Sequence, residues 1–236
     1  MSPPRTPLRL ATLAAEIGAC RACPRLVAWR ERVAREKRRA YRGETYWGRG
    51  VPGFGDPAAR IVLLGLAPGA HGANRTGRMF TGDGSGDFLY AALHRAGLAS
   101  QPLARGVDDG LVLTGAFVTN VCRCAPPDNR PAPDELARCA PFLERELAAL
   151  RPHVVVALGA IAWAAALAHL ARAGSAVPRP RPRFGHGAEL RLDGAPLLLG
   201  SYHPSRQNTQ TGRLTPRMLD AVLARASALS GRGGRR

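Results

Sequence analysis

The feature that most constrains this fold is a set of four cysteines in two distant parts of the chain. Cys20 and Cys23 form a C-x-x-C pair near the start, and Cys124 and Cys139 lie much further along the sequence. Four thiolates brought together suit either a zinc ion or an iron–sulfur cluster. Cys122 is a fifth cysteine, two residues before Cys124, and on a strand both side chains would point the same way. Cys122 is therefore an alternative ligand to Cys124.

Two other interpretations of the cysteines are weaker. They can be unrelated buried thiols, because a free cysteine packs as a small hydrophobic residue. A disulfide framework fits poorly, because the cysteine count is odd, the chain has 236 residues and no secretory signal opens it. We therefore expect a metal or cluster site that holds the surrounding surface in shape.

The charge of the chain indicates a polyanionic partner. The formal net charge is +17, and Lys37 is the only lysine among 34 basic residues. A bias toward arginine codons contributes to this usage but does not explain the excess of bases over acids. We favour nucleic acid over a membrane surface, since no basic helix with an aromatic face and no membrane-spanning apolar run is evident. Lys37 lies in a charged helical stretch, which argues against catalysis through a lysine imine.

The pattern of apolar residues predicts an α/β fold. Buried strands of apolar residues alternate with helices, which is typical of a parallel sheet covered on both faces. The expected strands are 60–66, 113–121, 154–158 and 197–202. The expected helices are 7–19, 25–41, 88–96, 134–150, 160–170 and 215–229. We expect one domain over residues 1–229 and a disordered basic tail over 230–236.

Three polar loops follow the predicted strands, at 67–86, 122–133 and 203–213. Ligands of such sheets bind at the carboxyl ends of the strands, so these loops are expected to converge on one site. The first loop lacks both the nucleoside-triphosphate and the dinucleotide glycine patterns. Its Phe80 either anchors the loop or stacks on an unpaired base. Its Asp83 either caps the next helix or holds a water.

The third loop carries His203 and then a run of hydrogen-bonding side chains. It is either a solvated surface turn or a surface that binds phosphate oxygens and base edges. The residues that would make such contacts are Ser205, Arg206, Gln207 and Asn208.

Taken together, these segments resemble family 5 of the uracil-DNA glycosylase superfamily, the type B enzymes with a four-cysteine iron–sulfur cluster. The resemblance runs from Cys20 to about Ala226. It rests on C-x-x-C-P-R-L-V at 20–27, P-G-F-G-D-P at 52–57, G-L-A-P-G-A-H-G at 65–72, N-R-T-G-R at 74–78, F-T-G-D at 80–83, R-C-A-P-P at 123–127, His203 and S-R-Q-N-T at 205–209.

The resemblance implies a three-layer α/β/α sandwich around a central, mainly parallel, four-stranded sheet. It implies a structural [4Fe-4S] cluster on Cys20, Cys23, Cys124 and Cys139, with Cys122 outside the family pattern. It also implies a monomer that binds DNA, with no membrane, in the bacterial cytoplasm at the nucleoid.

The resemblance assigns roles to residues of the loops. Asp83 corresponds to the functional carboxylate and His203 to the histidine of the second motif. Asn129 matches an active-site asparagine of the type B group, whereas Asn120 lies where other groups place a base-reading asparagine. Three further residues are expected to bind the base, namely Gly65, Ala67 and Phe80. Met79 replaces a common proline, which would loosen Phe80.

The implied activity is hydrolysis of the N-glycosidic bond of uracil in DNA, which leaves an abasic site without cutting the strand. By family analogy, hypoxanthine and ethenocytosine are further substrates. Two alternatives stay open. One is a DNA-binding module with a structural metal site and no chemistry, and the other is a redox iron–sulfur protein.

Overall fold

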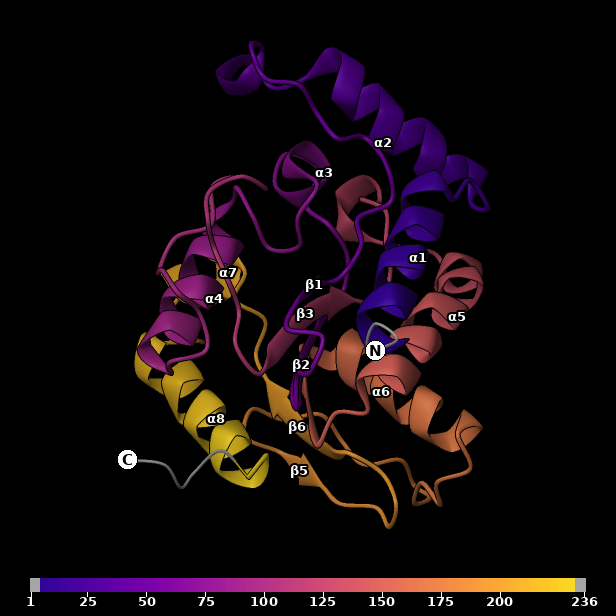
Figure 1. The fold of residues 1–236 in the computed structure, drawn as a ribbon, viewed down its shortest axis with the longest axis vertical. Coiled ribbons are helices and arrows are strands. Elements are labelled where there is room, and N and C mark those ends of the chain that lie inside the picture. The colour runs from indigo at the N-terminus through magenta and orange to yellow at the C-terminus, as the bar shows by residue number, and fades with distance from the viewer. Residues whose placement is uncertain (1–4, 232–236) are drawn as a thin grey trace.

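The computed structural model describes residues 5–231, and its core is a sheet between two layers of helices (Figure 1). The helices are α1 (Arg5–Ala19), α2 (Pro24–Glu36), α3 (Ala73–Thr76), α4 (Gly84–Arg95), α5 (Pro133–Leu150), α6 (Ala160–Arg172), α7 (Arg206–Gln210) and α8 (Pro216–Leu229), with 3-10 turns η1 (Arg39–Tyr41) and η2 (Pro127–Asn129). The strands are β1 (Phe54–Gly55), β2 (Ile61–Gly65), β3 (Ala116–Asn120), β4 (Val154–Leu158), β5 (Glu189–Leu190) and β6 (Leu197–Ser201).

The sheet confirms the predicted α/β class but corrects the predicted number of strands. Within residues 5–231 its order is β1-β3-β2-β4-β6-β5, so this part of the chain forms six strands rather than four. The four expected strands are parallel and form its centre, whereas β1 and β5 pair antiparallel at the two edges. Each edge strand has two residues, which is too short to show either an apolar run or an alternating pattern.

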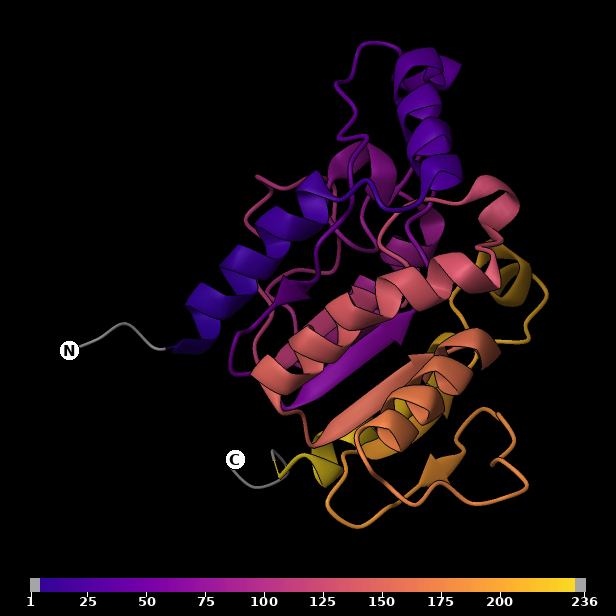
Figure 2. The ribbon, with the colours of Figure 1, turned by 90° about the vertical axis from the view of Figure 1, so that its right-hand side faces the viewer.

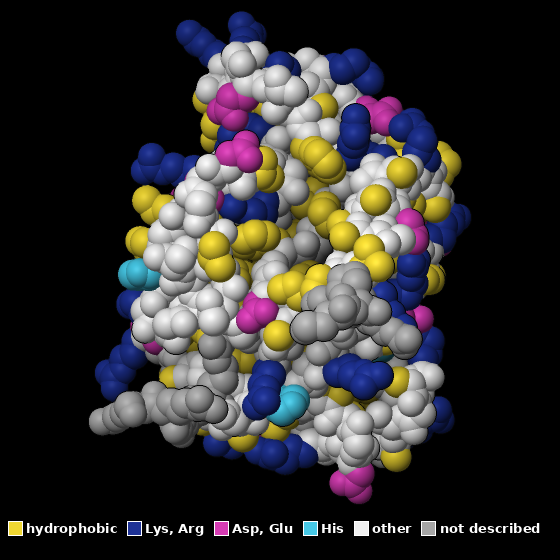
Figure 3. Space-filling model, in the orientation of Figure 1, with side chains coloured by type: hydrophobic (Ala, Val, Ile, Leu, Met, Phe, Trp, Pro, Cys, Tyr) yellow, Lys and Arg dark blue, Asp and Glu magenta, His cyan; other side chains and the backbone are white. Residues whose placement is uncertain are grey.

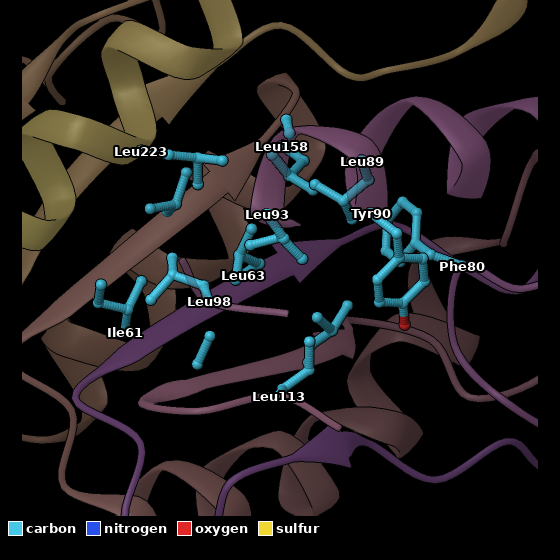
Figure 4. Packing of buried hydrophobic residues seen from close by; sticks show 14 of the residues in the cluster. Ile61, Leu63, Phe80, Leu89, Tyr90, Leu93, Leu98, Leu113, Leu158 and Leu223 are labelled. Carbon is cyan, nitrogen blue, oxygen red and sulfur yellow. The ribbon is translucent and has the colours of Figure 1, made fainter. Parts of the chain in front are cut away.

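The central strands are apolar throughout because both faces of the sheet are covered. Ile61 and Leu63 of β2 pack with α4 and α8 on one face, and Figure 4 shows part of this cluster. Val62 and Leu64 pack with α5 and α6 on the other face, and α1 packs against α5. Successive side chains of a strand point to opposite faces, so a strand in the middle layer needs apolar residues at every position.

Several element boundaries differ from the sequence expectation. The helix predicted for 25–41 ends at Glu36, because Lys37 has a left-handed backbone with φ 54°. The short helices α3 and α7 lie inside segments that we expected to be loops. The predicted tail starts at Ser230, which is buried and accepts a hydrogen bond from Arg60 at 3.3 Å, while 232–236 lie outside the described residues.

The parallel strands carry their three connecting loops to one end of the sheet. In Figure 2 the arrowheads of these strands point toward the end of the molecule where α7 lies. Gly65, the last residue of β2, pairs with Asn120, the last residue of β3. The segments that follow these two strands therefore start side by side. Within the described part of the chain, no helix has the length and apolar character that crossing a membrane requires.

Candidate active site

A cavity of about 710 Å³ lies at the carboxyl ends of the parallel strands. All three polar loops contribute to its lining, which includes both Asp83 and His203. A larger hollow of about 870 Å³ between α1, α2 and residues 47–52 contains no histidine. The cavity at the strand ends therefore combines a carboxylate with an imidazole, in the position that parallel sheets offer to ligands.

Asp83 caps helix α4 and also faces the cavity. Its Oδ1 accepts hydrogen bonds from the backbone N–H groups of Ser85 at 3.0 Å and Gly86 at 3.1 Å. Its Oδ2 lies against Gly72, where a Cβ would collide with it. Burial raises the pKa of Asp83, while these two N–H groups and Arg206 oppose the shift. The two roles considered for Asp83 are thus compatible, because each uses a different oxygen.

His203 follows strand β6 and supplies the imidazole. Burial lowers the pKa of His203 to about 4, so the ring is neutral at neutral pH. A neutral imidazole still donates one N–H hydrogen bond. The side-chain amide of Asn208 donates to the carbonyl of His203 at 2.8 Å and holds its backbone in place.

Phe80 lies between the two strand ends and His203. Its ring centroid is 5.9 Å from that of His203, and the two planes are inclined by 32°. Phe80 has φ 52°, a conformation that bulky residues rarely adopt and that is found at functional sites. The loop is nevertheless firmly held, because the Tyr90 hydroxyl donates to the Met79 carbonyl at 2.8 Å and Met79 is fully buried. Figure 4 shows Phe80 beside Tyr90 at the end of the core.

The two asparagines lie at different depths of the cavity. Asn120 is 1% exposed, and its Oδ1 has no hydrogen-bond partner within the described residues. Gly65 lies beneath it, since a Cβ there would collide with Asn120 Oδ1 and would reach the Phe80 ring at 2.6 Å. Asn129 is exposed at the rim, on the 3-10 turn η2. Both asparagines line the cavity, together with Ala67.

The rim of the cavity is polar and carries the residues expected to contact DNA. Ser205 caps α7 by accepting from the Asn208 N–H at 3.4 Å, and Arg206 and Gln207 are exposed beside it. These three line the cavity, whereas Asn208 does not. On the face in Figure 3, basic side chains are spread around the edge and outnumber the acidic ones.

The cysteines gather where α1, α2, α5 and the segment after β3 meet. The thiols affect one another electrostatically, Cys124 being influenced by Cys20 and Cys139, and Cys23 by Cys139. Cys122 is also close, and its Sγ donates to the Cys124 carbonyl at 3.4 Å. Among residues 5–231, no three ligand side chains converge closely enough for a single ion.

A buried arginine reports on the charge of this cysteine group. Arg30 is 1% exposed and donates to Cys124 Sγ and to the Cys20 carbonyl, both at 2.8 Å. Between residues 5 and 231, no carboxylate forms an ion pair with it. A buried guanidinium needs a compensating negative charge. Thiolates, which are the ligands of zinc and of iron–sulfur clusters, would provide it, so the residues present fit such a group.

The sequence profile of the family described as the uracil DNA glycosylase superfamily matches residues 52–227, which is well over half of the chain. The chain belongs to this superfamily. It is 59% identical to the type-5 uracil-DNA glycosylase of Thermus thermophilus, over 90% of this chain and 94% of that protein. It is 54% identical to that of Mycobacterium tuberculosis (93% and 81% covered) and 45% identical to that of Pyrobaculum aerophilum (90% and 89%). The predicted family, type 5, is confirmed.

Three residues that the sequence did not predict as site residues also line the cavity. Arg38 and Tyr41 do so because the chain leaves the helical path at Lys37 and turns back over the site. His71 also lines it, and its Nδ1 lies 3.0 Å from the hydroxyl of Tyr46. His71 lies in the glycine-rich motif of the first loop, which is the one signal in the sequence that pointed to it.

Proposed function

We propose that this chain is a uracil-DNA glycosylase that hydrolyses the N-glycosidic bond of uracil in DNA and leaves an abasic site. The observation that carries this proposal is the shared cavity of Asp83 and His203, with Phe80 and Asn120 between the strand ends. The names of the type-5 relatives support it. An enzyme of this kind extrudes the target nucleotide from the stack into a pocket, because its bond cannot be reached inside a duplex.

The two titratable residues would stabilise the charges that form as the glycosidic bond breaks. The sugar becomes cationic and the departing base anionic. Asp83 Oδ2 would stabilise the sugar cation and orient the attacking water, while Oδ1 stays engaged in the helix cap. Neutral His203 would donate its N–H to an oxygen of the base. Both interactions strengthen in the transition state, which is the condition for catalysis.

Other residues of the cavity would bind the base and the DNA. Phe80 stacks on the extruded base, Ala67 leaves room for it, and Asn120 and Asn129 offer amide groups to its edge. Gly65, which does not line the cavity, supports this pocket by leaving room for Asn120 and Phe80. Around the mouth of the cavity, Ser205, Arg206, Gln207 and Asn208 bind the opened backbone or support the residues that do.

The absence of a suitable lysine predicts a monofunctional enzyme. Lys37 is the only lysine, and its ammonium donates to the carbonyl of Arg42 at 3.3 Å. An imine that leads to β-elimination therefore has no amine side chain in the cavity. A purified protein that cuts the strand at the released site would contradict this.

The base pocket also predicts substrates beyond uracil. The loop after β2 contributes Ala67, Pro68 and Gly69 rather than charged or amide side chains. With few polar groups to impose one pattern, hypoxanthine and ethenocytosine are further substrates under this proposal.

We further infer that Cys20, Cys23, Cys124 and Cys139 hold a [4Fe-4S] cluster. By holding the cluster, these residues would tie the start of α2 and the segment after β3 to α5, and the cluster would supply structural support. Arg30 would offset its negative charge. The protein would act as one domain over residues 1–229, as a monomer, in the cytoplasm at the nucleoid.

A glycosylase assay separates this function from its alternatives. The full-length protein is incubated with an end-labelled uracil oligonucleotide, and alkali then cuts at any abasic site. We expect cleavage only after alkali and none with a matched thymine oligonucleotide. Binding to both oligonucleotides without cleavage would favour the DNA-binding module. A reversible one-electron change at the cluster, without excision, would favour the redox protein.

The pH dependence of excision is expected to follow the shifted pKa values of the two residues assigned to the reaction, Asp83 and His203. Because the pKa of Asp83 is raised, its ionised form is lost on acidification at a higher pH than for an ordinary carboxyl of pKa 3.8. Because the pKa of His203 is lowered to about 4, its ring stays neutral through pH 5–8. We therefore expect single-turnover rates that are flat above neutrality and fall on the acid side. A change in the excision rate centred near pH 6.5 that disappears in His203→Gln would show that the pH dependence comes from titration of His203 rather than of Asp83.

The salt dependence of binding tests the role of α7. Arg206→Gln is expected to weaken binding to a uracil oligonucleotide and to reduce the slope of log affinity against log salt by about one, since each phosphate contact releases about one counterion. Arg9→Gln is the control, because Arg9 is an exposed residue of α1 outside the cavity. If the slopes of log affinity against log salt are equal for both variants, Arg206 does not contact a DNA phosphate.

A further inference from the structure

The amide of Asn120 meets an unusual partner at the back of the cavity. Its Nδ2 donates to the thioether sulfur of Met79 at 3.0 Å, and its Oδ1 is buried with no partner in the described chain. Both residues are buried, Asn120 at 1% and Met79 at 0% exposure. Asn120 also lines the cavity, and its Oδ1 lies close to Gly65 beside the ring of Phe80, on which a base would stack.

The chemistry of sulfur fixes which way this amide points. A thioether has lone pairs and no hydrogen to donate, so it can accept from Nδ2 but cannot pair with Oδ1. Reversing the amide would bring two acceptors together and would lose the hydrogen bond. The backbone of Met79 is held by the hydroxyl of Tyr90, which donates to its carbonyl at 2.8 Å, and by that of Thr81, which does so at 3.2 Å. Its side chain is fully buried, which limits movement of the sulfur.

We propose that Met79 is a positioning residue for base selection, because it turns the carbonyl oxygen of Asn120 toward the base. This inference rests on the proposed function. An acceptor at this point pairs with the imino N–H of uracil or hypoxanthine. Cytosine and adenine carry a lone pair at the corresponding ring nitrogen. Asn120 Oδ1 would then have no hydrogen-bond donor and would be repelled by this lone pair. A pocket that loses a buried hydrogen bond discriminates against the ligand that causes the loss. Ethenocytosine has its ring nitrogen closed into the etheno ring and carries no N–H there, so under this proposal it is a weaker substrate than uracil or hypoxanthine.

The alternative is that Met79 only fills space in the core, which is a common use of methionine. Met79→Leu separates the two, because leucine has nearly the same volume but no acceptor. Under the proposal, the Asn120 amide of this variant is free to reverse and the preference for uracil falls. If Met79 only fills space, any change affects all bases alike.

The test measures binding without chemistry. In an Asp83→Asn background, affinities are compared for single-stranded oligonucleotides that carry one uracil or one cytosine at the same position. We expect Met79→Leu to lower the uracil-to-cytosine preference roughly tenfold, the loss that one hydrogen bond produces. Met218→Leu, a partly buried methionine of α8 outside the cavity, is the control and should keep the preference.

Two outcomes would overturn the inference. One is an unchanged preference in Met79→Leu with an unchanged melting temperature, and the other is an equal loss of affinity for both oligonucleotides. Single-turnover excision of uracil is measured in the Asp83-containing parent as a separate readout. No excision by that parent would reject the proposed function, whereas the binding preference and its response to Met79→Leu decide the inference independently.

Discussion

Asp83→Asn is expected to slow single-turnover excision of uracil by roughly two to four orders of magnitude, the range found for a positioned carboxylate or a single transition-state-stabilising group. The asparagine keeps the shape of the side chain and an oxygen for the helix cap. It removes the negative charge that faces the developing sugar cation. DNA affinity should change little, because this charge matters after binding.

Asp87→Asn is the matched control for this variant. Asp87 lies in the first turn of the same helix but is exposed and does not line the cavity. We expect its excision rate to stay close to that of the parent. If Asp83→Asn instead weakens DNA binding and leaves the single-turnover rate intact, Asp83 is not a catalytic residue.

Asp83→Asn should also make the fold more stable. Since burial raises the pKa of Asp83 above its unfolded value, the folded state binds the proton more tightly than the unfolded state. The stabilising contribution of protonated Asp83 is therefore fully present below pH 3.8 and is lost as pH rises through the raised pKa of the folded state. A neutral asparagine at this position avoids the cost of burying an ionised carboxylate. A higher melting temperature together with lost activity is the expected pattern of a strained functional site.

The sequence was sufficient for the parts of the fold that depend on long local patterns. The apolar runs of β2 and β4 have the length and composition of buried strands, so both were predicted to within a residue or so. The two-residue strand β5 and the five-residue helix α7 carry no periodic signal. Their positions depend on contacts with the rest of the molecule rather than on their own residues.

The same distinction holds for the site. The shared cavity of Asp83 and His203 was predictable, because motifs place both residues after strands of one parallel sheet. The pairing of Asn120 with Met79 was not, since it depends on the register of β2 with β3 and on the left-handed backbone of Phe80. Arg30 gave no signal either, because its helix looked like a solvated charged face, yet its guanidinium is buried against Cys124.

The largest structural effect is expected from Cys124→Ser. Loss of one thiolate ligand should remove iron from the purified protein, abolish its broad visible absorption and lower the melting temperature by roughly 10 °C or more, because binding of a structural metal group is part of the folding free energy. Arg30 would then be buried without a compensating charge, which costs about 3–5 kcal/mol when one partner of a buried pair is removed. Iron content and thermal melting are the measurements.

Cys122→Ser is the control that tests the ligand assignment. Cys122 is fully buried beside the same group, but its Sγ donates to the Cys124 carbonyl, and a serine hydroxyl can make the same hydrogen bond. The serine variant should therefore keep its iron and lose little stability. If iron is retained in Cys124→Ser but lost in Cys122→Ser, then Cys122 is the cluster ligand and Cys124 is not. Stoichiometric zinc in the unmodified protein would contradict the assignment of an iron–sulfur cluster. The buried Arg30 would still be balanced by the negative charge of the thiolates.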